Sequence, residues 1–259
     1  MSAVLMALWI CDVHLVASLG LFAMFLIAVC TAVFYGALLW TIYLAVEPSV
    51  RRHWPQVLVS WTNVLSGHLA DAVVGRDVLI GVALGIWFTL LIRGVALALG
   101  AESSVAFPGD VALLSGVRST AAVVLQEAPY AVRNVLFYFF ILFALRVLLR
   151  RQWAAVLAFV GFFTVLQALG NDRAWLGGAL GVLYFGTAAF VIVRRGGLLA
   201  FMVGSFVSSL LFDVIVTLDT SAWYMGNTLL LIGIVVGLTL WSFYTAVGGR
   251  IWSAQASRT

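Results

Sequence analysis

Lysine is absent from this sequence, and charged residues of every kind are scarce. All fourteen basic residues are arginine, and only 9% of the 259 residues are charged. The absence of lysine excludes activities that need one, including Schiff-base chemistry and the lysine-containing phosphate-binding motifs. The scarcity of charge excludes a soluble globular domain, because a surface in water needs more charged side chains than this.

Cysteine and histidine are also few, which limits metal and redox chemistry. The two cysteines, Cys11 and Cys30, lie in apolar stretches nineteen positions apart, without metal-site or redox spacing. The three histidines form no metalloprotease motif. The sequence therefore predicts no cofactor. A nucleic-acid partner is not expected either, because the arginines are spread among hydrophobic runs and do not line one polar face.

Long hydrophobic runs dominate what is present: 64% of the residues are hydrophobic, and the mean hydropathy is +1.14. A membrane-spanning helix needs about 20 apolar residues, because each residue adds about 1.5 Å. The runs predict an all-α polytopic transmembrane bundle of about seven spans (six to eight) that forms one membrane domain over residues 1–259. The predicted spans are residues 15–46, 78–99, 130–149, 153–169, 175–193, 198–218 and 222–247.

The connection between the first two predicted spans is too long for a simple turn. Apolar residues recur in it at helical spacing, namely Trp54, Leu58, Trp61, Leu65, Leu69 and Ala72. The opposite face carries Gln56, Ser60, Asn63, Gly67 and Asp71. This pattern predicts an amphipathic interfacial helix over residues 54–74 on the cytoplasmic surface, with Trp54 and Trp61 at headgroup level. Gly75, Arg76 and Asp77 follow, and we interpret them as a stop for this helix and a cap for the next span.

Arginine is distributed unequally between the two sides of the predicted bundle. The connections after spans one, three and five and the C-terminal tail carry ten arginines, against three on the opposite side. Because cytoplasmic loops of membrane proteins carry an excess of arginine and lysine, this asymmetry places the C-terminus in the cytoplasm. We expect a multi-pass protein of the bacterial inner membrane.

Two stretches near the ends of the chain are similar to a known family. The first is Tyr43–Gly81, with Glu47-Pro48, Arg51-Arg52, Trp54-Pro55, Ser60-Trp61 and Val74-Gly75-Arg76-Asp77. The second contains Leu218–Tyr224, Phe243–Thr245 and Gly248–Arg250. These residues resemble the C-terminal multi-span membrane region of bacterial serine/threonine protein kinases of acidobacterial type.

The resemblance implies a membrane anchor or signal-input module without an activity of its own. The chain has no glycine-rich ATP loop, no His-Arg-Asp catalytic loop and no Asp-Phe-Gly, so it does not carry a kinase domain. The expected partners are the lipid bilayer and a cytoplasmic kinase domain or a second copy of this chain. The alternative function is a small-solute transporter or permease, and a membrane-embedded enzyme has no residue constellation to support it.

Two groups of residues are candidates for function. Arg93 and Asp213 lie at similar depths, roughly 24 and 27 Å from the cytoplasmic ends of their spans, which motivates the hypothesis of an intramembrane ion pair. The alternative is that each reaches the outer interface independently, and additive effects of the two neutralisations would refute the pair. A cytoplasmic coupling surface is the second candidate, with topology determination and helix capping as the simpler explanation of the same residues. It comprises Glu47, Arg51, Arg52, Trp54, Trp61, Arg76 and Asp77.

Overall fold

The computed structural model describes residue 6 and residues 19–53, 57, 59–98, 117–170, 173–195, 197–213 and 225–247. This part of the chain is helical and contains no strand. Its elements are α2 (Leu19–His53), α3 (Val59–Leu65), α4 (Ala72–Ala98), α6 (Val117–Leu149), α7 (Gln152–Leu169), α8 (Ala174–Phe190), the π-helical turn η3 (Val191–Arg195), α9 (Gly197–Asp213) and α10 (Met225–Ala246).

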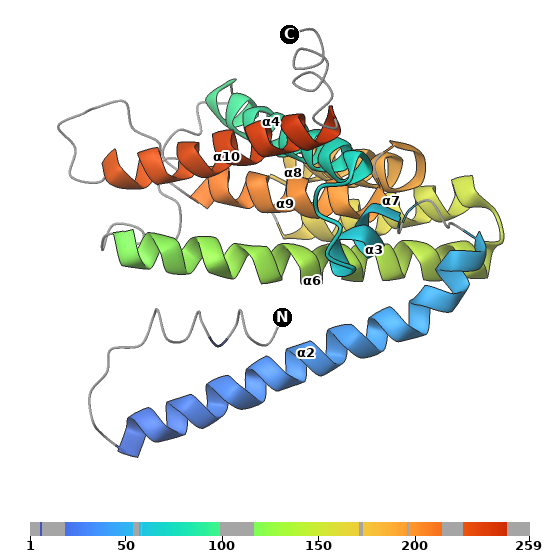
Figure 1. Cartoon of the computed structure of the whole chain (residues 1–259). Coiled ribbons are helices and arrows are strands. Elements are labelled where there is room, and N and C mark those ends of the chain that lie inside the picture. The colour runs from blue at the N-terminus through green and yellow to red at the C-terminus, as the bar shows by residue number, and fades with distance from the viewer. Residues whose placement is uncertain are drawn as a thin grey trace, which may run out of the picture.

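The long helices lie side by side and alternate in direction, with α9 at the centre (Figure 1). Helix α9 packs against α4, α6, α3 and η3, while α10 packs on α4 and α8 packs on α7. Helix α2 runs diagonally along the outside and contacts α6. The sequence of α9 explains its position: most of its side chains are apolar or small, so a helix can surround them on every side.

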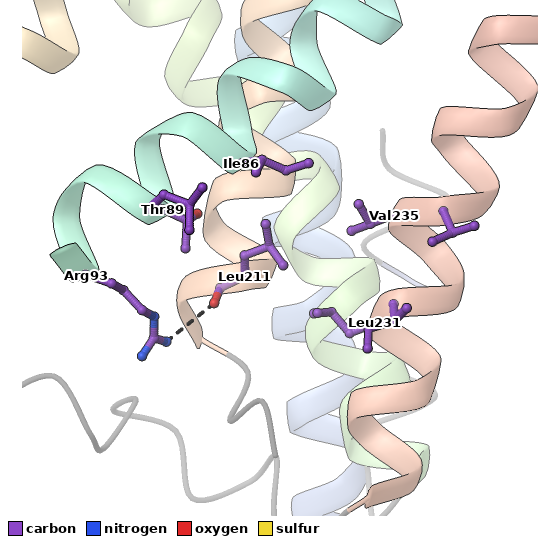
Figure 2. Close-up of a pocket in the computed structure, with 9 residues that line it drawn as sticks. Ile86, Thr89, Arg93, Leu211, Leu231 and Val235 are labelled. Carbon is purple, nitrogen blue, oxygen red and sulfur yellow. Dashed lines mark hydrogen bonds between the residues drawn. The ribbon is translucent and has the colours of Figure 1, made fainter. Parts of the chain in front are cut away.

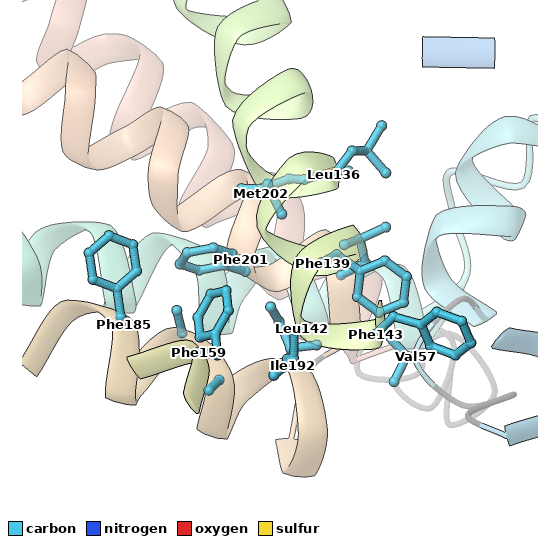
Figure 3. Packing of buried hydrophobic residues seen from close by; sticks show 14 of the residues in the cluster. Val57, Leu136, Phe139, Leu142, Phe143, Phe159, Phe185, Ile192, Phe201 and Met202 are labelled. Carbon is cyan, nitrogen blue, oxygen red and sulfur yellow. The ribbon is translucent and has the colours of Figure 1, made fainter. Parts of the chain in front are cut away.

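Aromatic side chains fill the core between α6, α7, α8 and α9 (Figure 3). The ring of Tyr138 lies edge-on to Phe163 at 5.0 Å and to Phe185 at 5.5 Å between centroids. Phe163 and Phe185 stack at 4.8 Å. Lipid tails are as apolar as these side chains, so helices in a bilayer associate through close packing of this kind.

Glycines allow α4 and α9 to cross closely. A Cβ atom built on Gly81 would lie 2.6 Å from the carbonyl oxygen of Ala200, and one on Gly85 would lie 2.7 Å from Cβ of Val207. Gly204 of α9 faces both, since its own Cβ would lie 3.2 Å from the Gly81 carbonyl oxygen. The small residues Gly81, Gly85 and Gly204 therefore allow the two backbones to come into contact.

Five helical segments are long and apolar enough to cross a membrane, which indicates a multi-pass membrane protein. They are Ala72–Val95, Thr120–Leu149, Gln152–Leu169, Ala174–Val193 and Thr228–Ala246. Large apolar side chains on their outer faces are exposed, including Leu169 at 78% and Leu148 at 77%, as expected of surfaces that face lipid. The predicted spans 15–46 and 198–218 correspond to α2 and α9, whose apolar segments Phe22–Leu38 and Gly197–Phe212 are shorter.

Several helix boundaries differ from those predicted. Helix α2 continues past Glu47 and Pro48 to His53, and α6 begins thirteen residues before the predicted start at residue 130 and contains Pro129. Proline removes only one backbone hydrogen bond, and helices in membrane proteins tolerate it. Glu47, Pro48 and Pro129 therefore limit the most hydrophobic parts of α2 and α6, but the helices themselves continue past these residues.

The predicted continuous helix over residues 54–74 is wrong. Its described part is the seven-residue α3, followed by a turn and then by α4 from Ala72. Gly67 has φ +82°, a conformation that glycine adopts easily and that ends a helix. Burial also departs from the predicted faces: Ser60, placed on the polar face, is 1% exposed, whereas Leu65, placed on the apolar face, is 57% exposed.

Candidate functional site

One end of the bundle carries most of the arginines, and we call it the arginine-rich end. Contacts between helix ends define it: Arg146 donates a hydrogen bond to Gln152, Gly75 lies against Thr245, and Gly197 lies against the Val57 carbonyl oxygen. Its described arginines stand at the ends of α6 and η3 and at the starts of α4 and α7. They are Arg76, Arg146, Arg150 and Arg151, together with Arg194 and Arg195, of which only the backbone is described.

Asp77 is the buried charge at this end. Its side chain is 4% exposed, and one of its carboxylate oxygens, Oδ1, accepts hydrogen bonds from Arg76 Nε at 3.1 Å and Arg76 Nη2 at 2.9 Å. The Arg76 side chain is 58% exposed. The pair thus connects a buried carboxylate to a cation at the surface, and this pairing limits the cost of burying the charge.

The short helix α3 covers Asp77 on the inside of the bundle. The Ser60 hydroxyl lies beside the Asp77 carboxylate, and it makes no hydrogen bond of standard geometry within the described residues. Trp61 packs among the buried valines at the start of α4, and its indole N–H likewise has no hydrogen-bond partner there. Ser60 therefore brings α3 against the buried Asp77 of α4.

Asp71 holds the turn between α3 and α4. Its Oδ1 accepts a hydrogen bond from the Val73 backbone N–H at 2.8 Å, which caps the first turn of α4. Its Oδ2 accepts a second hydrogen bond from Asn63 of α3, also at 2.8 Å. The interpretation of Asp77 as the cap is therefore wrong, because Gly75, Arg76 and Asp77 lie inside the helix that Asp71 caps.

The structure brings three members of the predicted coupling surface together and leaves the others undecided. Trp61, Arg76 and Asp77 lie around the contact between α3 and α4. The backbones of Glu47, Arg51 and Arg52 belong to the last turns of α2, while their side chains and all of Trp54 lie outside the described residues. Ser60, Asn63 and Asp71 belong to this site and were not candidates.

A cavity of about 470 Å³ lies toward the opposite end, between α4, α9 and α10 (Figure 2). Its walls are apolar except for Thr89 and Arg93. The Thr89 hydroxyl donates to the Gly85 carbonyl oxygen of its own helix at 3.0 Å. Arg93 is therefore the charged group of this cavity.

Arg93 reaches the C-terminal end of α9. Its Nη2 donates to the carbonyl oxygens of Phe212 at 3.1 Å and Leu211 at 3.4 Å, and the guanidinium carbon lies 5.7 Å from the centre of the Phe212 ring. The last carbonyls of a helix have no partner within the helix, and in lipid they have no water either. Arg93 supplies that partner, and its charge complements the negative end of the helix dipole.

The predicted Arg93–Asp213 ion pair remains a hypothesis. Asp213 is the last residue of α9, next to the carbonyl groups that Arg93 contacts, so the two backbones are placed as the hypothesis requires. The Asp213 side chain lies outside the described residues. Sequence spacing predicted that Arg93 and Asp213 lie at one level but gave no sign of the contacts of Arg93 with backbone oxygens.

No protein-family model matches this chain, and no curated protein or solved structure matches it either.

Proposed function

We propose that this chain is a seven-span membrane module with a cytoplasmic arginine-rich end, and that it anchors and relays a signal to a cytoplasmic partner without catalysing a reaction itself. The partner that the sequence resemblance suggests is a protein kinase domain, and a second copy of the chain is the other candidate. One observation carries this proposal: the connection from α2 folds back as α3 onto Asp77 and α9 at the arginine-rich end.

This arrangement supports signal input because it links the outer helix α2 to the centre of the bundle. The chain leaves α2 at His53, Val57 packs in the core, and α3 contacts both α4 and α9. A displacement of α2 within the membrane would therefore act on Val57 and on the contacts of α3 with α4 and α9. The exposed arginines of this end, Arg76, Arg150 and Arg151, offer a surface for an acidic cytoplasmic partner.

The seven-span count is supported by the two shorter apolar helices. Helix α2 has 35 residues, about 52 Å, and reaches well past its apolar core. Helix α9 has 17 residues, about 25 Å, but it lies among other helices and has its last carbonyls satisfied by Arg93. Both can therefore be counted as spans, so the ends of α2, α6, η3 and α10 share one side, and the arginine asymmetry favours the cytoplasm for that side.

Site-specific photo-crosslinking tests this function. A photoreactive phenylalanine analogue replaces Arg150, an exposed residue in the turn between α6 and α7, or Arg173, an exposed residue at the opposite end. In membranes of the source bacterium we expect Arg150 adducts with a polypeptide that carries a kinase domain, or with this chain itself. Adducts at Arg173 but not at Arg150, or adducts with neither expected partner, would contradict the proposal.

The transporter alternative has one observation in its favour, the cavity beside Arg93. A path for polar solutes needs polar groups along its length, and the lining of this cavity offers Thr89, which is bonded within its helix, and Arg93. Solute flux in proteoliposomes that disappears in Arg93→Gln would favour transport over the signalling module.

A further inference from the structure

The cavity at Arg93 is a groove between two helices that touch elsewhere. Helices α4 and α10 meet at the arginine-rich end, where Gly75 leaves no room for a side chain against Thr245. About three turns further along α4, from Ile86 onward, the cavity of about 470 Å³ separates α4 from Leu231 and Val235 of α10. Volumes of this size are typical of sites for small ligands.

The groove opens toward the side of the bundle. Residues on its two rims are exposed, with Leu90 of α4 at 65%, Val236 of α10 at 47% and Ile232 at 43%. In a bilayer this face meets acyl chains. Leu211 of α9 lies on the inner side of the groove, so a chain that entered from the side would contact three helices.

Arg93 places a cation at one end of this apolar groove (Figure 2). A guanidinium has five N–H donors, and its flat edge fits a phosphate through two parallel hydrogen bonds. The bonds that Arg93 makes to described residues use Nη2, on the carbonyl oxygens of Leu211 and Phe212. Its Nε and Nη1 groups donate to no residue within the described ranges, so the described residues leave this edge open to an anion, and the carboxylate of Asp213, whose side chain lies outside those ranges, is the competing occupant.

Arg93 lies along α4 at a level that suits contact with a lipid headgroup. Arg93 stands five residues before the end of the helix at Ala98, about 8 Å along its axis. From Arg93 to Ile86 the groove extends about 10 Å in the other direction, toward the middle of the bundle. With the arginine-rich end on the cytoplasmic side, as proposed above, its charged end lies near the outer membrane surface and its apolar length lies within the hydrocarbon region.

We propose that this groove holds one acyl chain of an anionic phospholipid of the outer leaflet, and that Arg93 binds the lipid phosphate. Charge complementarity decides the occupant: a phospholipid with net negative charge satisfies both the apolar walls and the remaining guanidinium edge. An apolar helix from a second copy would cover the walls but leave that edge unsatisfied in a poorly hydrated site. This site lies away from the arginine-rich end and does not depend on the signalling role proposed there, while its assignment to the outer leaflet rests on the orientation proposed above.

Lipid titration followed by native mass spectrometry tests the site on the full chain in detergent. The ligands are phosphatidylglycerol and phosphatidylcholine with identical acyl chains. We expect phosphatidylglycerol to bind about tenfold more tightly, because both lipids offer Arg93 a phosphate but only phosphatidylcholine carries a quaternary ammonium that cancels the negative charge. Arg93→Gln should remove this preference, whereas the matched variant Arg133→Gln, at another arginine within a long helix, should keep it. Val235→Trp, which fills the groove, should weaken binding of both lipids.

A photoreactive phosphatidylglycerol with a diazirine in its acyl chain locates the site on the unsubstituted protein. We expect crosslinks on peptides that contain Ile86–Leu90 and Leu231–Val236. This measurement remains decisive if Arg93→Gln fails to fold through loss of the α9 contact. Crosslinks confined to other peptides, or a lipid preference that persists in Arg93→Gln, would each overturn the proposal.

Discussion

Individual glycines decide how closely α4 and α9 approach. Gly81, Gly85 and Gly204 meet where the two helices cross, and each position is too close to neighbouring backbone or Cβ atoms for a larger side chain without movement. Gly233 and Gly237 of α10 have the same four-residue spacing, yet a Cβ atom at either position would meet nothing within 4 Å. Glycine spacing alone therefore shows only that one face of a helix lacks side chains. That face contributes to packing only where another helix lies against it.

Gly85→Ala is expected to destabilise the bundle by about 1–3 kcal/mol, the usual cost of overpacking. The added methyl group would lie 2.7 Å from Cβ of Val207 and 2.8 Å from the Gly204 carbonyl oxygen, so α4 and α9 must move apart. The free energy of unfolding in mixed dodecylmaltoside and SDS micelles, followed by circular dichroism, measures the effect.

Gly233→Ala is the matched control for that experiment. It makes the same chemical change in a helix where the new methyl group meets open space. We expect its stability to stay within about 0.5 kcal/mol of the unsubstituted protein. Equal losses in the two variants would mean that glycine at position 85 serves the helix itself and not the contact with α9.

The helices show which features of this fold can be predicted from a sequence. Hydropathy located a helix in each of the seven predicted segments, because burial in lipid selects long apolar runs. It misplaced helix ends at Pro48, Asp77 and residue 130, because a backbone helix continues wherever its hydrogen bonds can form, whether or not its side chains suit lipid. Hydropathy therefore locates the apolar segment and leaves the ends of the helix to capping residues.

The coupling surface could be predicted only in part, for a similar reason. Arg76 and Asp77 are neighbours in sequence, so their pairing required no knowledge of the fold. Ser60 looked like a surface residue because periodicity placed it opposite the tryptophans. Its burial depends on α3 packing against α4 and α9, a contact between segments far apart in the chain. No local pattern carries that information.

Asp71→Ala is expected to loosen both α3 and the start of α4. The substitution removes the cap on the Val73 N–H, which costs about 0.5–2 kcal/mol, and also the acceptor for Asn63. Amide hydrogen exchange should become faster at residues 59–65 and 72–76, while α7 stays unchanged. Asp71→Asn is the control, because its amide oxygen can still accept a hydrogen bond from the Val73 N–H. Loss of protection confined to α4 would show that Asn63 does not hold α3 in place.

The arrangement of all the helices gives the arginine distribution a physical basis. Because neighbouring helices alternate in direction, the ends of α6 and η3 and the starts of α4 and α7 lie at one end of the bundle (Figure 1). The short central helix α9 fits this pattern, since it begins beside Val57 at the arginine-rich end and finishes at Arg93. The arginine count, taken from sequence alone, and the packing of the helices therefore agree on which turns share a side.

Cysteine labelling at two exposed positions tests which side faces the cytoplasm. Gln152→Cys marks the arginine-rich end and Ala174→Cys marks the opposite end, and neither change removes an arginine. Both are made after Cys11 and Cys30 are replaced by serine. Cytoplasmic arginines resist transfer across the membrane, so a membrane-impermeant maleimide should label the Ala174→Cys variant in intact cells and the Gln152→Cys variant only after permeabilisation.

Two other labelling patterns would contradict this topology. Labelling of the Gln152→Cys variant alone in intact cells would place the arginine-rich end outside and remove the basis for a cytoplasmic partner there. Labelling of both variants in intact cells would place the two positions on the same side of the membrane. The chain could then not cross the membrane an odd number of times between them. Helix α7, which connects them, would then not span the bilayer.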